Sequence, residues 1–362
     1  MTPVQAGAFL TIDLKAIAEN RRSLQAHLGN GTECAAVLKA DAYGLGAAAV
    51  AKELYRTGCR TFFTAYAFEG AVVRSVAPEA KIYLLHGGWE GTERLCTENG
   101  LVPVFGSLRQ IESWEAYAKQ TGRTLPAALH IDTGMSRFGL TGENVDAFCA
   151  RPPEGLKFEL VISHLACADD RDSAKNNAQL VAFDTACDRL KEALGYDFKR
   201  SLAASDGTRL PDSRFYKDIA RPGIALYDNA VRLDARVLAV FNAKAGQTVG
   251  YGATFELKED KRLAVLSIGY ADGFSRSLSN KGKVVLCGRK VPVLGRVSMD
   301  LTVVDATGIP YEELRSAETA EIFGGEIPLK EFAGLAGTID YEILTKLGNR
   351  IYRRYVNEGG EG

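Results

Sequence analysis

Short apolar runs alternate with amphipathic stretches over roughly the first two thirds of the chain. The runs are rich in β-branched and aromatic residues and are bounded by turn residues, a pattern typical of strands. Farther on, Leu180, Phe183, Cys187 and Leu190 recur at spacings of three or four, which predicts an amphipathic helix. The predicted strands are, in order, residues 9–14, 35–39, 61–66, 81–87, 101–107, 126–132, 158–165, 201–205 and 224–227.

Strands that alternate with helices predict βα units and a parallel sheet. About eight such units in about 220 residues fit a closed (β/α)₈ barrel, with an open doubly wound sheet as the alternative. After about residue 230, β-branched runs are broken by glycines every 8 to 12 residues, which favours a mostly antiparallel β domain. The sequence therefore predicts an α/β protein with a barrel over 9–230 and a β domain over 231–362. Residues 1–8 are a candidate addition to the β domain.

Composition indicates which classes of binding partner are excluded and in which cell compartment we expect the protein. The 362 residues are 46% hydrophobic and 25% charged, with a net charge of −1, as in a soluble globular protein. This balance argues against a nucleic-acid binder or a membrane protein. Seven scattered cysteines without a CxxC pair indicate reduced thiols and a cytoplasmic location, and the four histidines lack metal-ligand spacing. We therefore expect no metal.

Polar residues stand at or just after the ends of several predicted strands. They are Lys39, Arg137, His164, Ser205 and Arg221. The C-terminal ends of strands are where a parallel barrel collects its catalytic groups. A lysine at the end of a buried strand can lose its charge and act as a nucleophile or base, although it can also extend to solvent.

A glycine motif behind this lysine offers another interpretation. "GLGAAA" at 44–49 fits the dinucleotide fingerprint G-x-G-x-x-A and follows a predicted strand. However, Ala40–Tyr43 separate the strand from Gly44, whereas the fingerprint needs its first glycine at the tight turn. The acidic residue expected about 20 residues later is met only weakly by Glu69. An NAD enzyme is thus a minor alternative.

Seven stretches in order along the chain resemble the alanine racemase family. They are "AVLKADAYGLG" (36–46), "HIDTGMSRFG" (130–139), "SHLACADD" (163–170), "ASDG" (204–207), "ARPGIALY" (220–227), "IGYADGFSR" (268–276) and "GRVSMD" (295–300). The resemblance spans both predicted domains. It implies a barrel followed by a β domain, pyridoxal 5'-phosphate as cofactor, a small amino acid as substrate, and a homodimer with shared active sites. The implied activity interconverts L- and D-alanine, and the D-alanine would either feed cell-wall synthesis or connect to alanine catabolism.

The resemblance assigns the cofactor-binding residues of the barrel. Lys39 would hold the cofactor covalently and, once released, take the α-hydrogen from one face of the substrate. Tyr43 would donate its hydroxyl group to the phosphate. Ser205 and the backbone of Gly223 and Ile224 would complete the phosphate site.

A second set of residues would serve proton transfer. Arg221 would face the pyridine nitrogen, and because a guanidinium group keeps its proton, that nitrogen stays unprotonated. Tyr270 would be the second base, linked through His164 to Arg221. Lysine and tyrosine side chains have unperturbed pKa values near 10, so neighbouring cations would have to lower both.

Substrate binding completes the implied site. Arg137 would contact the cofactor's phenolic oxygen and the substrate carboxylate, which the backbone N–H of Met299 would also hold. Asp300 would orient this part of the site. Tyr270, Met299 and Asp300 would come from the other subunit.

Two positions depart from the family pattern. Many members carry a carbamylated lysine seven residues before the counterpart of Arg137, and this chain has His130 there. Many carry a tyrosine near the C-terminus that touches the phosphate, and our alignment places Asn349 there. A smaller residue would admit a hydroxymethyl side chain, so a serine or broad-specificity racemase is an alternative. A further alternative is a non-catalytic barrel that binds the cofactor, although such a protein would not need Tyr270.

Overall fold

The computed structural model describes residues 2–357, so the last five residues of the predicted β domain lie outside it. The chain divides into two compact units. The barrel unit consists of Ile17–Ala42 and Gly46–Tyr227. The β unit consists of the chain up to Ala16, the short segment Tyr43–Leu45 and the chain from Asp228 onward.

Seven parallel strands form the main sheet of the barrel unit, and each pairs with the next along the chain. Their apolar residues are buried almost without interruption, as expected where helices cover the outer face and side chains fill the interior. The strands are β3 (Ala36–Val37), β4 (Thr61–Thr64), β5 (Lys81–Leu84), β6 (Leu101–Phe105), β7 (Leu125–His130), β8 (Leu156–Ile162) and β9 (Lys199–Ser201).

A short parallel pair closes this sheet into a barrel. It joins β2 (Glu33–Cys34) to β10 (Ile219–Ala220). On one side, the N–H of Ala35 donates to the carbonyl of Ala220 at 3.0 Å. On the other, the N–H of Arg221 donates to the carbonyl of Ala203 at 2.9 Å. The predicted (β/α)₈ barrel is confirmed.

Two of the predicted barrel strands were wrong. Residues 9–14 fall largely in β1 (Ala8–Asp13), which belongs to the β unit and pairs with β11 (Val231–Ala243) and β19 (Ile351–Val356). Leu10 and Ile12 are fully buried in that sheet, and an apolar strand pattern does not say which sheet a strand joins. Residues 224–227 form the 3₁₀ helix η4 (Ile224–Tyr227), because a short apolar run fits a helical turn as well as a strand.

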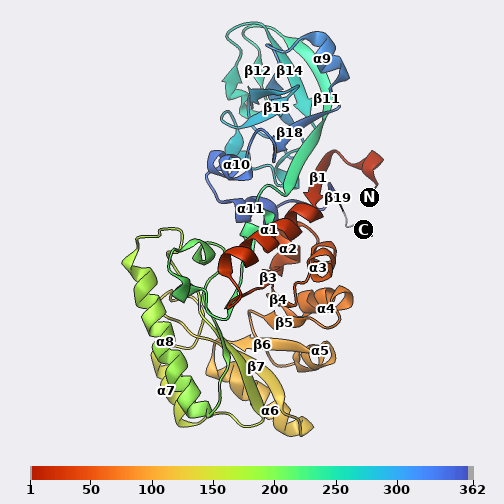
Figure 1. The fold of residues 1–362 in the computed structure, drawn as a ribbon. Coiled ribbons are helices and arrows are strands. Elements are labelled where there is room, and N and C mark those ends of the chain that lie inside the picture. The colour runs from red at the N-terminus through yellow and green to blue at the C-terminus, as the bar shows by residue number, and fades with distance from the viewer. Residues whose placement is uncertain (1, 358–362) are drawn as a thin grey trace. The chain divides into compact units, whose positions relative to one another are not determined.

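Helices follow the barrel strands in sequence, and Figure 1 shows α3, α4 and α5 along one side of β4, β5 and β6. The helices are α1 (Leu14–Leu28), α2 (Lys39–Gly44), α3 (Ala47–Arg56), α4 (Ala67–Val76), α5 (Glu93–Glu98), α6 (Leu108–Thr121), α7 (Gly142–Ala150) and α8 (Ala174–Leu194). Short 3₁₀ helices lie at η2 (Gly207–Arg209) and η3 (Ser213–Phe215).

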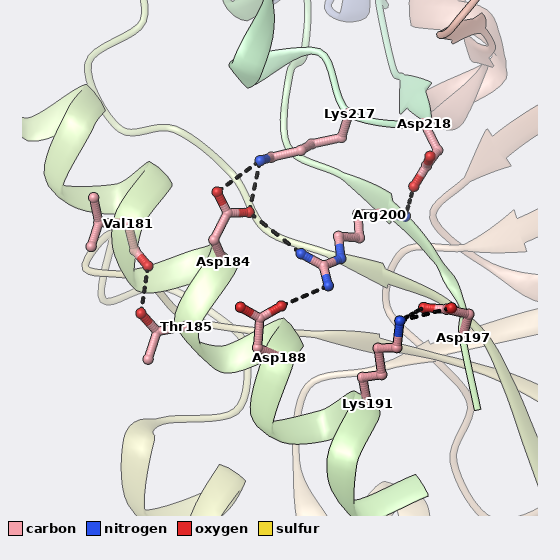
Figure 2. Close-up of polar contacts among 9 residues, drawn as sticks. All are labelled: Val181, Asp184, Thr185, Asp188, Lys191, Asp197, Arg200, Lys217 and Asp218. Atoms are coloured by element: carbon pink, nitrogen blue, oxygen red, sulfur yellow. Dashed lines mark hydrogen bonds and ion pairs between the residues drawn. The ribbon is translucent and has the colours of Figure 1, made fainter. Parts of the chain in front are cut away.

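Helix α8 is tied to the starts of the last two barrel strands by ion pairs (Figure 2). Asp184 and Asp188 lie one turn apart on the helix. The Nζ atom of Lys217 lies 2.7 Å from Asp184, and an Nη atom of Arg200 lies 2.8 Å from Asp188. Asp218 accepts the backbone N–H of Arg200 at 2.6 Å. The ties fix the strands that lead to Ser205 and Arg221.

The β unit is built around the 13-residue strand β11. This strand pairs with β1, β14 and β18, because bulges let it bend from one group of partners to the next. The remaining strands are β12 (Thr248–Val249), β13 (Phe255–Glu256), β14 (Lys261–Leu266), β15 (Lys283–Leu286), β16 (Arg289–Pro292), β17 (Thr302–Asp305) and β18 (Thr319–Phe323).

Short helices complete the β unit, and Figure 1 shows α9 and α10 beside its strands. They are η1 (Pro3–Gln5), η5 (Tyr251–Ala253), η6 (Tyr270–Asp272), η7 (Arg276–Leu278), α9 (Tyr311–Ser316), α10 (Leu329–Ala336) and α11 (Asp340–Thr345). Across residues 2–357, no helix combines the length and apolar character that crossing a membrane requires.

Candidate active site

Lys39 opens an unusual turn directly after the barrel strand β3. The next four residues, Ala40–Tyr43, all have positive φ angles, between 52° and 60°. A left-handed turn of L-residues costs roughly 1–2 kcal/mol per residue, so tertiary contacts must stabilise it. Asp41 closes it, since its carboxylate accepts the N–H of Ala47 at 2.7 Å and its carbonyl accepts that of Gly46 at 2.9 Å.

The end of this turn belongs to the β unit, where strand β19 holds it. The Nε atom of Arg353 donates to the carbonyl of Gly44 at 2.7 Å, and the hydroxyl group of Tyr355 donates to that of Leu45 at 2.9 Å. A Cβ atom on Gly44 would lie 2.8 Å from the carbonyl oxygen of Leu344, and φ there is +82°. Both the close approach and the angle therefore require glycine.

Glu69 supports the start of the turn, a role that the sequence analysis missed. Its carboxylate accepts the N–H groups of Ala40 at 2.7 Å, Ala65 at 2.8 Å and Tyr66 at 3.1 Å. The residue weighed as a ribose ligand is thus buried and committed to the backbone around Lys39. No motif marks it, because the contact to Ala40 joins segments 29 residues apart.

The structure brings Arg137, His164 and Arg221 close to Lys39, and His130 lies near both arginines. Lys39 remains accessible to solvent, but its pKa is lowered, first because neighbouring groups partly desolvate its amine and then because Arg137 and Arg221 lie near it, against the opposing effect of Glu69. Burial lowers the pKa of both His130 and His164 to about 3, and the two arginines add to the effect. The barrel mouth is therefore electropositive, and its histidines are neutral near pH 7.

Arg221 is a buried cation held by neutral groups. Its Nη2 atom donates to the carbonyl of Ser163 at 2.6 Å, and its Nη1 atom donates to the hydroxyl group of Ser201. Burial lowers its pKa to about 9, so it remains charged near neutral pH. Among residues 2–357 no carboxylate pairs with it, which leaves its charge for a ligand to balance.

Ser205 lies beside the backbone amides that start η4. Its hydroxyl oxygen accepts the N–H of Gly223 at 3.0 Å and that of Ala225 at 3.3 Å. The predicted group of Ser205, Gly223 and Ile224 therefore does come together. Neighbouring amides and a hydroxyl group are suited to binding an anion.

His130 and Arg137 lie on either side of a loop at the end of β7. The Nδ1 atom of His130 is buried and has no hydrogen-bond partner within the described part of the chain. Arg137 is exposed, and no hydrogen bond or ion pair joins it to residues 2–357. The loop is fixed instead by Gln179, which the sequence analysis missed. It donates to Thr133 at 3.0 Å and to the carbonyl of His164 at 2.9 Å.

In the β unit, Tyr270 and Met299 lie on two loops that cross. The N–H of Tyr270 donates to the carbonyl of Ser298, and the N–H of Ala271 donates to that of Met299, each at 3.0 Å. The side chains of Tyr270 and Met299 are 44% and 53% exposed, so both are available to a ligand or a second chain. Asp300 pairs with Arg350, a residue that the sequence analysis passed over. The predicted link from Tyr270 to His164 stays a prediction.

The tyrosine next to Tyr43 is Tyr341 of α11, with ring centroids 5.8 Å apart. Burial and this neighbour raise the pKa of Tyr43, which keeps its hydroxyl group a donor. Asn349 lies elsewhere, in the turn before β19. Because Tyr341 already supplies a tyrosine beside Tyr43, the argument for serine from a smaller residue at Asn349 loses its basis.

Comparison with known proteins gives this arrangement a family. The model of the alanine racemase N-terminal domain matches residues 12–230, and that of the C-terminal domain matches residues 230–355. The chain belongs to the alanine racemase family. The family acts as an amino-acid isomerase, so the NAD alternative is excluded.

Individual relatives cover almost the whole chain. A biosynthetic alanine racemase of Agrobacterium fabrum is 43% identical over 97% of this chain and 94% of its own length. A catabolic alanine racemase of the same organism is 39% identical over 98% of this chain and 93% of its own length. The crystal structure of alanine racemase from Bartonella henselae, with covalently bound pyridoxal phosphate, has a TM-score of 0.90 and 38% identity. That match covers 97% of this chain and 100% of the Bartonella chain.

Proposed function

We propose that the protein interconverts L- and D-alanine with pyridoxal 5'-phosphate and two bases, Lys39 of one subunit and Tyr270 of the other. The observation that carries the proposal is the cluster at the barrel mouth, where Lys39 lies near Arg137 and near Arg221, a buried cation that bonds only to neutral groups among residues 2–357. Partial burial and these two cations lower the pKa of Lys39, so it gives up its proton more readily than a free lysine and can act as a nucleophile or base.

The residues of the barrel mouth fit this cofactor chemically. Ser205 and the amides of Gly223 and Ile224 suit a phosphate, and Tyr43 offers a hydroxyl donor to it. Arg221 suits an aromatic nitrogen acceptor, since burial leaves it charged but without a carboxylate partner among residues 2–357. When bound, pyridoxal phosphate supplies an aldehyde that joins the substrate amino group and a ring that withdraws electrons from the Cα–H bond.

The charge of Arg221 bears on the reaction outcome. An arginine donates to the ring nitrogen but does not give up its proton at neutral pH. Electron withdrawal is then weaker than it would be opposite a carboxylate. Arg221 would thereby favour return of the proton to Cα over its transfer to another carbon, and so favour racemisation.

Two bases on opposite faces of the substrate would move the proton. Lys39 would hold or release it on one face, while Tyr270 of a second subunit would do so on the other. Arg137 and the Met299 N–H would bind the substrate carboxylate, and His130 would stand in place of the carbamylated lysine. The exposure of Tyr270 and Met299 supports a surface that docks against a second copy. We place the enzyme in the cytoplasm as a homodimer whose D-alanine feeds cell-wall synthesis or connects to alanine catabolism, since the relatives include a biosynthetic and a catabolic enzyme.

Mixed dimers test the shared site. Lys39→Ala and Tyr270→Ala homodimers should each be nearly inactive. Co-expressed, they pair at random and half the dimers are mixed. Each mixed dimer has one site with both lesions and one wholly intact site, so about a quarter of wild-type activity should return. If both residues came from one chain, every site would keep a lesion. No recovery where mixed dimers are shown to form would exclude the shared site.

A further inference from the structure

Three segments of the β unit meet beneath Tyr270 and Met299. They are the Tyr270 loop (268–274), the Met299 loop (298–301) and the turn 346–350 before β19. The Tyr270 and Met299 loops already share two backbone hydrogen bonds. They also approach so closely that a Cβ atom on Gly269 would lie 2.3 Å from the carbonyl oxygen of Met299. The positions of the two loops are therefore interdependent.

Arg350 joins a carboxylate from each of these loops. Its Nε atom donates to Oδ1 of Asp272 at 2.8 Å, and its Nη1 atom donates to Oδ1 of Asp300 at 2.7 Å. Asp272 comes two residues after Tyr270, and Asp300 directly follows Met299. The planar, five-donor guanidinium group can span two carboxylates in fixed directions, which a lysine ammonium group does not do.

Asp272 extends the connection into the Tyr270 loop itself. It is buried, and its second oxygen accepts the N–H of Gly269 at 3.0 Å. Its carbonyl accepts the N–H of Gly348, so the turn that carries Arg350 is also bonded to this loop. The side chain of Arg350 is 53% exposed, and ion pairs at such exposure add little to global stability. The contacts are instead placed to fix one loop against the other.

We infer that Arg350 is a positioning residue that sets the Tyr270 hydroxyl group at a fixed distance from the Met299 amide. The inference rests on the proposed function, in which Tyr270 exchanges the proton and Met299 helps to bind the carboxylate. A displacement of about 1 Å between a base and a bound substrate can lower the rate about 100-fold. Loss of Arg350 should therefore affect both kcat and KM.

The test compares Arg350→Ala and Arg350→Lys with wild type. The control is Arg289→Ala, which removes a similarly exposed arginine of the same unit whose partner is Glu313 at 2.6 Å. Hydrogen–deuterium exchange would be followed at the amides of residues 269–273 and 298–301. Kinetics with L-alanine would be measured on the holoenzyme, with melting temperature as the check on folding.

We expect Arg350→Ala to exchange at least about tenfold faster in both loops, and to lower kcat about tenfold to 100-fold with a raised KM. Arg350→Lys should recover part of each effect, because it retains one ion pair. Arg289→Ala should change neither the exchange of the two loops nor the kinetics with L-alanine. If Arg350→Ala does not fold, Arg350→Lys alone decides between faster and unchanged exchange.

The outcomes separate this inference from the proposed function. Suppose that exchange is faster in the two loops of Arg350→Ala but the wild type does not racemise alanine. This result would support the positioning role of Arg350 and refute the proposed function. If the wild type racemises alanine but exchange in the two loops is unchanged in the Arg350 variants, the positioning role of Arg350 is wrong, whatever the kinetics of the variants. If Arg289→Ala changes loop exchange and kcat as much as Arg350→Ala does, the positioning role is also wrong, because the effects would then reflect general loosening of the β unit.

Discussion

The barrel mouth and the Tyr270 region of the β unit differ in how their charges are balanced. In the barrel mouth, Arg221 is buried against neutral groups, and no residue of 2–357 bonds to Arg137. In the β unit, Arg350 is paired with two carboxylates. Burying an unbalanced cation such as Arg221 is costly, and the exposed Arg137 adds a second free charge, so the barrel mouth is suited to an anionic ligand.

The two regions also differ in backbone strain. The barrel mouth carries a left-handed turn of four residues after Lys39. The Tyr270 region instead relies on close crossing at Gly269, whose φ of −149° is ordinary extended backbone. Backbone strain is common where the chain must approach a ligand closely, as in the barrel mouth. In the Tyr270 region the charges are already paired within the chain before any ligand binds. One region thus provides binding and the other provides a rigid support for Tyr270.

Removing the lysine and removing the tyrosine should separate these two tasks. Lys39→Ala should lower kcat at least about 10³-fold and abolish the mass added when borohydride fixes the cofactor on the peptide containing residue 39. Tyr270→Phe should lose a comparable share of activity but keep that added mass. Lys52→Ala, in the exposed face of α3, is the control and should keep both. An adduct on another lysine would remove Lys39 from the site.

Much of the candidate site could be proposed from the sequence because the family pattern is local. The motif around Lys39 and the stretch that carries Arg221 each fit in about ten residues, so a single sequence reveals them. Glu69, Gln179 and Arg350 act by contacts across 29, 46 and 78 residues, for which a single sequence has no signal. The alignment near the chain end placed Asn349 at the position of the family's C-terminal tyrosine. In the structure the tyrosine whose ring contacts Tyr43 is Tyr341.

The fold was predictable for a related reason. Alternating strands and helices specify a parallel barrel wherever the repeats are regular. The pattern was misleading at its ends, where 9–14 joins the β unit and 224–227 forms a 3₁₀ helix. At both places a short apolar run fits more than one structure, and only packing decides between them.

A pH experiment should show that the barrel mouth is the acid-sensitive region. The folded protein holds His130 neutral with a pKa of about 3, whereas an unfolded histidine titrates near 6.5. Below pH 6.5 the unfolded chain therefore binds a proton that the folded chain refuses, and stability falls as the pH falls towards 3. His130→Asn removes this one proton, so the variant should lose about 2 kcal/mol less than wild type between pH 7.5 and pH 5.

Urea unfolding of cofactor-free protein at the two pH values would measure this difference. The change with pH is compared within each protein, because the substitution itself can alter stability equally at both values. An identical loss in the variant and in wild type would mean that His130 is not held neutral. The result would then leave the electropositive character of the barrel mouth without support.

The smallest expected effect concerns strain in the turn after Lys39. Ala40 has a φ of +52°, which costs an alanine roughly 1–2 kcal/mol, and its N–H bond to Glu69 survives a change to glycine. Glycine gives back about 0.5–1 kcal/mol through its greater freedom in the unfolded chain, so Ala40→Gly should raise stability by up to about 1 kcal/mol. The matched control is Ala48→Gly in the right-handed helix α3, which should lower stability by about 0.5–1 kcal/mol. The two substitutions delete the same methyl group within ten residues of each other, and both sites are exposed. Opposite signs in urea unfolding would therefore locate the strain in the left-handed turn, whereas equal losses would show that the turn is not strained.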